Sequence, residues 1–150
     1  MPDLKMYPSG EAGAMMSDPV SGSELRQLRV RVSLADVNAG KTVLPATPGI
    51  KYRLQDFSVM SIGGALAGVT DVRVLGTRAG SSVALGVVPQ AGLGQSALLR
   101  AGAATVTILA DGASFTALDA NTAVTVGKTG GTGTTASAVD FFLSYAVEQA

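Results

Sequence analysis

Apolar residues recur at every second position in several short stretches of this chain. Residues 28–34 (LRVRVSL) and residues 139–147 (VDFFLSYAV) show this alternation most clearly. A period of two residues is typical of a β-strand that buries one face and leaves the other accessible. Residues 51–62 alternate as well, but their phase slips near Gln55–Asp56, which predicts a β-bulge.

Shorter apolar segments, bounded by glycine, proline and threonine, predict the other strands. These segments are residues 69–75, 83–88, 105–109 and 122–126. Residues 95–100 form either a helical turn or a short strand, Asp111-Gly112 predicts a turn, and Gly127–Gly133 predicts a Gly/Thr loop. No segment has the pattern of a ten-residue amphipathic helix. The expected fold is therefore all-β, an antiparallel β-sandwich or jelly-roll-like domain of about eight strands. Its expected core is Val30, Val32, Phe57, Val59, Val74, Val106, Ile108, Phe141, Leu143 and Tyr145.

Residues 1–24 differ from the rest of the chain and predict an extended N-terminal arm, ahead of a sandwich domain at residues 25–150. Prolines and glycines interrupt the segment, and no period of two or 3.6 residues runs through it. Scattered apolar side chains are its candidate contacts with a partner: Met6, Tyr7, Met15 and Met16. Methionine adapts well to irregular grooves. We expect this arm to dock on another chain.

Charge is scarce, balanced and unevenly distributed. Only 15% of the residues are charged, whereas about 25% is typical of soluble domains. The 11 basic residues balance 11 acidic ones, and molecules with so little net repulsion tend to associate. Residues 1–24 carry a net charge of −3, residues 25–100 of +6 and residues 101–150 of −3. An acidic arm and a basic body can pair within one molecule or between neighbours.

Cysteine and histidine are absent from the sequence. Their absence excludes disulfides, thiolate or imidazole metal ligands, and catalytic triads that need either residue. The neutral charge balance argues against nucleic-acid binding, and no stretch approaches 18 uninterrupted apolar residues. We therefore expect no enzyme activity, no cofactor and no metal, and neither a nucleic-acid nor a membrane partner.

Three short motifs resemble nucleotide-binding signatures without their context. Gly40-Lys41-Thr42 and Gly127-Lys128-Thr129 spell the end of a P-loop, but the glycine that should precede each by five positions is missing. Gly92-x-Gly94-x-x-Ala97 resembles a dinucleotide fingerprint, but no β-α-β unit surrounds it. We interpret all three as turns. A glycosidase-like pair of carboxylates stays open as an alternative, because aspartates on strands far apart in sequence can meet.

Five residues are candidates for a contact surface in the sandwich domain. Arg26, Arg29 and Arg31 form a basic stripe along one strand, which is either a solvated face or an interface with acidic groups of a neighbouring subunit. Asp140 alternates with Phe142 on the last strand, so either Phe142 is exposed, or this face is buried against a partner and Asp140 is paired there. We favour the partner.

Two stretches resemble a known family. Lys51–Thr77 (KYRLQDFSVMSIGGALAGVTDVRVLGT) contains a strand that ends in Gly-Gly, followed by the strand GVTDVRV. The segment GTGTTASAVDFFLSY near the C-terminus provides a matching last strand. Over residues 25–147 these patterns resemble the small head proteins of tailed bacteriophages, specifically capsid decoration (cement) proteins. The resemblance rests on strands and turns, so it identifies no site residue, and the arm lies outside it.

The resemblance implies a viral structural protein located on the capsid surface of the virion. Such a protein would bind the assembled major capsid protein and reinforce the shell, often as a homotrimer. Two alternatives remain open. One is a head-fibre, spike or tail adsorption module, which should bind sugar or protein through aromatic loops. The other is a small-molecule-binding or carboxylate-based enzyme domain.

Overall fold

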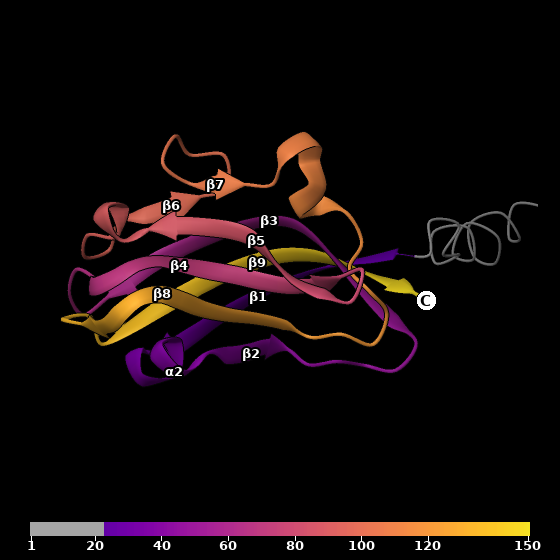
Figure 1. Ribbon diagram of the computed structural model, residues 1–150, viewed down its shortest axis with the longest axis horizontal. Helices are drawn as coiled ribbons and strands as arrows, with labels where there is room; N and C mark the ends of the chain where they lie inside the picture. Colours follow the sequence, from indigo (N-terminus) through magenta and orange to yellow (C-terminus); the bar gives the residue numbers. More distant parts are fainter. Residues whose placement is uncertain (1–22) are drawn as a thin grey trace, which may run out of the picture.

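The computed structural model describes residues 23–150, which form a sandwich of two antiparallel β-sheets (Figure 1). One sheet has the strand order β1-β9-β3-β6, and the other has the order β2-β8-β4-β5-β7. Within residues 23–150 the strands are β1 (Ser23–Ser33), β2 (Lys41–Leu44), β3 (Ile50–Ile62), β4 (Ala67–Arg78), β5 (Ser81–Pro89), β6 (Leu98–Arg100), β7 (Thr107–Ile108), β8 (Val124–Thr134) and β9 (Ala138–Gln149). The expected all-β antiparallel sandwich is confirmed, with nine strands in place of about eight.

The strands pair in a nested order along the chain. β1 pairs with β9, β2 with β8, β3 with β6 and β4 with β5, which is the connectivity of a jelly roll. The two-residue β7 extends the second sheet beyond β5. Because β3 also pairs with β9, the last strand lies inside the four-stranded sheet, between β1 and β3.

Three short helical segments connect strands in the described part of the chain: α2 (Leu34–Ala39), η3 (Gln90–Gly92) and η4 (Ala110–Phe115). The alternation pattern does not predict α2. Its start is capped by the Ser33 hydroxyl, which accepts a hydrogen bond from the Asp36 N–H at 3.2 Å. Gly40, with φ at +85°, ends it. In η4 the backbone turns at Asp111 and Gly112, which both have positive φ, as the Asp-Gly turn signal predicted.

The strand boundaries confirm several of the sequence predictions. The β3–β9 register shifts between Leu54 and Asp56, so the bulge lies where the phase of the alternation slips. Residues 95–100 take the strand alternative, because β6 occupies Leu98–Arg100. The strand expected at residues 105–109 shortens to the two residues of β7.

The loop expected at Gly127–Gly133 is wrong, because β8 continues through these residues to Thr134. The β4–β8 ladder is irregular here, with register shifts on either side of Val69, and the two backbones come very close. A Cβ atom on Gly131 would lie 2.7 Å from the carbonyl oxygen of Gly68. The glycines thus permit close strand contact instead of marking a loop.

The core lies between the two sheets and matches the expected positions closely. Eight of the ten expected core residues are buried, and Val30 and Ile108 are partly buried against them. Along β9, Val139, Phe141 and Leu143 point into the core and are at most 2% exposed. The residues between them, Asp140 and Phe142, must therefore lie on the opposite side of the sheet.

Candidate functional site

The candidate site is the side of the four-stranded sheet that faces away from the second sheet, which we call the outer face. Its most unusual residue is Asp140, a carboxylate with 0% exposure on the side of the sheet that faces away from the core. Arg31 lies directly opposite Asp140 in the β1–β9 register. Arg29 is two residues before Arg31 and lies on the same face of β1. The strand pairing therefore brings two arginines over one aspartate.

The two arginines enclose the Asp140 carboxylate with four hydrogen bonds. Arg31 Nε donates to Oδ1 at 2.7 Å and Arg31 Nη2 to Oδ2 at 3.0 Å. Arg29 donates to Oδ2 from Nη2 at 2.7 Å and from Nε at 3.3 Å. Such forked, charge-assisted bonds are strong and fix the orientation of both partners. The hydrogen bond and charge of Arg31, followed by those of Arg29, hold the pKa of Asp140 below its usual range.

Phe142 lies beside this cluster and lines a shallow groove. The Arg29 guanidinium lies over the Phe142 ring, 5.2 Å from its centroid, in a cation–π contact. The groove has a volume of about 480 Å³ and extends across β1, β9, β3 and β6, where it is lined by Gln27, Ser58, Leu98 and Arg100 among others. Leu98 is 43% exposed. The groove is thus an accessible surface with an aromatic floor and cationic sides.

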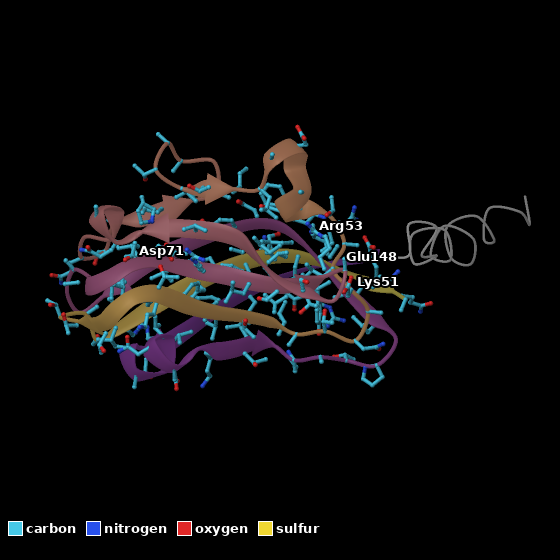
Figure 2. All side chains as sticks on the ribbon, viewed as in Figure 1. Lys51, Arg53, Asp71 and Glu148 are labelled. Atoms are coloured by element: carbon cyan, nitrogen blue, oxygen red, sulfur yellow. The ribbon has the colours of Figure 1, made fainter. Side chains whose placement is uncertain are left out.

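A second group of charges lies at the end of the outer face near the C-terminus (Figure 2). Arg53 Nη2 and Glu148 Oε1 form an ion pair at 2.8 Å, and Lys51 lies directly opposite Glu148 in the β3–β9 register. Leu25, which is 67% exposed, is opposite Ala146 on the same face. Charged and apolar side chains are therefore present at both ends of the outer face.

The structure separates the predicted interface residues into two groups. Arg29, Arg31, Asp140 and Phe142 come together on the outer face, whereas alternation along β1 places Arg26 on the opposite side of that strand. The expected single stripe of three arginines is therefore wrong. Met6, Tyr7, Met15 and Met16 lie outside the described residues, so their predicted contacts stay predictions.

Asp140 is paired within the chain itself, and the burial of this face against a partner stays a prediction. The chain's own Arg29 and Arg31 satisfy this carboxylate, because β1 is the direct neighbour of β9. Both arginine side chains remain more than half exposed, at 59% and 56%. Phe142 is half-buried by its neighbours on the sheet.

Arg100 and Leu98 belong to this surface and were missed by the sequence analysis. The register places them on β6 opposite Ser58 and Met60 of β3, next to Phe142. Arg100 has no ion-pair partner among residues 23–150. Its segment is only three residues long, so periodicity could not assign its face. The one feature of the sequence that could have indicated this surface is Arg100, a cation at the end of a short apolar run.

The two Gly-Lys-Thr motifs do not form phosphate-binding loops. Gly127-Lys128-Thr129 lies within β8. Gly40-Lys41-Thr42 leads from α2 into β2, where Lys41 donates to Asp36 at 3.1 Å. This hydrogen bond is the main cause that lowers the pKa of Asp36. Each lysine is therefore part of a strand and not of a loop that surrounds a phosphate group.

Other carboxylates of the described chain are also held in their ionised form. The backbone N–H groups of Gly80 and Ala79 donate to Asp119 and lower its pKa. Burial would raise the pKa of Asp71 on β4 (Figure 2), but hydrogen bonds from Arg73 and its charge outweigh burial and lower it. A general acid in a glycosidase-like pair needs a raised pKa. Asp119, Asp71 and Asp140 are therefore unsuited to that role.

In residues 23–150, no three carboxylates gather closely enough to hold a metal ion. None of the helices in that region is both long and apolar enough to cross a membrane.

No protein-family model matches the sequence, and no curated protein matches it.

Proposed function

We propose that this protein is a structural protein of a virus particle, one that binds the assembled capsid surface and reinforces it as a decoration protein does. The observation that supports the proposal best is the composition of the outer face. Phe142, Arg29, Arg31 and Arg100 gather on it beside exposed Leu98. Aromatic residues and arginine are enriched at protein–protein interfaces, while lysine and carboxylates are depleted there.

The outer face is also rigid before any partner arrives. Asp140 fixes both arginines through four hydrogen bonds, and Arg29 in turn stacks on Phe142. A side chain that is already ordered loses less conformational entropy on binding, so a preorganised surface binds more tightly for the same contacts. This arrangement suits a protein that stays bound to its partner and does not catalyse a reaction.

The balanced charge of the chain supports the same proposal. A net charge of zero with 15% charged residues gives little repulsion between copies packed closely on a lattice. The described aromatic side chains lie on strands or pack against the core, as Phe115 of η4 does. Aromatic loops that would bind sugar, as an adsorption module requires, are thus not a feature of residues 23–150.

The test is to mix the purified full-length chain with heads of its own virus that have been stripped of outer proteins. The heads are then sedimented, and the bound chain is measured by gel densitometry. We expect saturable binding at a constant ratio to the major capsid protein, and density on the outside of the shell by cryo-electron microscopy. Phe142→Ala should lower the occupancy several-fold, and Ser82→Ala, on an exposed edge of the second sheet, should not.

Binding to isolated tails or fibres, with none to heads, would favour the adsorption module instead. Absence of binding to any part of the particle would contradict a structural role in the virion.

A further inference from the structure

We propose that the outer face binds the acidic N-terminal segment, residues 1–22, of a second copy of this chain. The inference concerns self-association of free copies in solution, before this face meets a capsid, and does not depend on the capsid role. Its starting point is the groove of about 480 Å³ beside Phe142, which crosses all four strands of the sheet. An open groove with an aromatic floor suits an extended peptide segment with intermittent apolar side chains.

The excess of positive charge on the outer face favours an acidic occupant. Five cations lie on the face, Arg29, Arg31, Lys51, Arg53 and Arg100, against three carboxylates, Asp56, Asp140 and Glu148. Asp140 and Glu148 are already paired within the face. Arg100 has no ion-pair partner in the described chain. An approaching acidic group would therefore meet an excess of positive charge.

Residues 1–22 have the complementary composition. They contain three carboxylates and one lysine, so they supply the negative charge that the outer face lacks. Their apolar residues Met6, Tyr7, Met15 and Met16 are interspersed with the charges and include flexible methionines that fit irregular grooves. The acidic and apolar groups of this segment thus match the cationic and aromatic groups of the groove.

The direction of β1 favours a neighbouring copy over the same molecule. The chain enters β1 at Ser23, opposite Glu148, about 20 Å along β9 from Phe142 at about 3.3 Å per residue. From Ser23 the strand runs toward the groove, so the preceding residues would have to reverse direction to reach the groove of their own copy. A segment of 22 residues can extend up to about 70 Å, which is ample to reach an adjacent molecule.

Photo-cross-linking of the full-length chain tests the proposal, because the sequence contains no native cysteine. Met15→Cys is labelled with benzophenone maleimide and mixed with wild-type chain uniformly labelled with a heavy nitrogen isotope. After irradiation, mass spectrometry identifies the cross-linked peptides. We expect cross-links from position 15 to peptides of β6 or β9 that carry the heavy isotope, because these belong to the second copy.

Two other outcomes would overturn the proposal. Cross-links to light peptides of the outer face, with none to heavy peptides, would show that the segment folds onto its own copy. Cross-links only to other surfaces, or none to protein, would show that the outer face is not its docking site.

Charge reversal gives an independent measurement in the same full-length protein. We expect Arg100→Glu to weaken self-association about tenfold in sedimentation equilibrium at low salt, and the added change Asp18→Lys to restore part of it. Lys128→Glu is the matched control on the second sheet and should have little effect. Equal effects of Arg100→Glu and Lys128→Glu would indicate a non-specific charge effect and contradict the proposed contact.

Discussion

Asp140 illustrates how one side chain depends on residues more than a hundred positions away. Its carboxylate is buried on an outer face only because Arg29 and Arg31 cover it from the adjacent strand. The neighbouring Phe141 points the opposite way and is fully buried in the core. Two adjacent residues on one strand therefore have different roles. Asp140 links β9 to β1 on the outer face, and Phe141 packs in the core between the two sheets.

The lowered pKa of Asp140 leads to a prediction about acid stability. A carboxylate whose folded pKa lies below its unfolded value of about 3.9 stabilises the protein above that pH, and this contribution is lost as the pH falls toward the folded pKa. Asp140→Asn should lower the free energy of unfolding at pH 7 by about 1–2 kcal/mol. The cost is modest because both arginines are more than half exposed and can be rehydrated.

Urea unfolding between pH 2.5 and pH 8 measures this effect. Below about pH 4 the variant should lose stability less steeply than the wild type. Between pH 6 and pH 8 both proteins should be nearly insensitive to pH, because the chain contains no histidine. An unchanged slope below pH 4 would show that Asp36, Asp71 and Asp119 account for the acid sensitivity without Asp140.

At the scale of elements, the two sheets are in close contact where a glycine of one faces an aromatic ring of the other. Gly86 of β5 lies against the Phe57 ring of β3, and a Cβ atom at this position would overlap the ring. Gly127 of β8 has more room, because its Cβ would make an ordinary contact with Leu75 Cδ1 at 3.7 Å. The two glycines can therefore be compared directly, because an added methyl group would overlap a neighbour at Gly86 but would fit at Gly127.

Gly86→Ala should therefore destabilise the sandwich by about 1–3 kcal/mol through overpacking. Gly127→Ala should be neutral, or stabilising by up to about 1 kcal/mol, because alanine restricts the unfolded chain. Thermal and urea unfolding of both variants provide the comparison. Equal stability of the two variants would mean that Phe57 moves aside without cost and that the contact between the sheets is loose.

At the scale of the whole molecule, the nested pairing joins segments that are far apart in sequence. β1 pairs with β9 across nearly the whole described chain, and β2 pairs with β8 inside that pair. Each of these pairs must close a long loop before its contacts contribute. Folds dominated by such pairings refold slowly for their size.

We therefore expect refolding of the full-length chain on a time scale of milliseconds to seconds. Stopped-flow dilution from urea, followed by tyrosine fluorescence, measures this rate, because Tyr52 and Tyr145 are in edge-to-face contact in the core, with ring centroids 5.9 Å apart. Refolding within microseconds would indicate that local structure, and not the nested strand order, limits the rate.

The local features of this protein could be predicted from its sequence. Alternation assigned strands to residues 28–34 and 139–147 and identified their buried faces, because a period of two needs no knowledge of the neighbouring strands. The phase slip in residues 51–62 located the bulge for the same reason. Asp140 and Phe142 were recognised as unusual because alternation places a carboxylate and an aromatic ring on the same face of one strand.

The faces that meet in the folded protein could not be predicted in this way. Alternation within one strand cannot show that β1 lies beside β9, so the partner of Asp140 was unknown until the nested pairing placed Arg29 and Arg31 over it. Gly127–Gly133 looked like a loop because glycine has low strand propensity, yet β8 forms there because close contact with β4 requires glycine. Both outcomes depend on contacts between distant segments, which the order of residues along one segment does not contain.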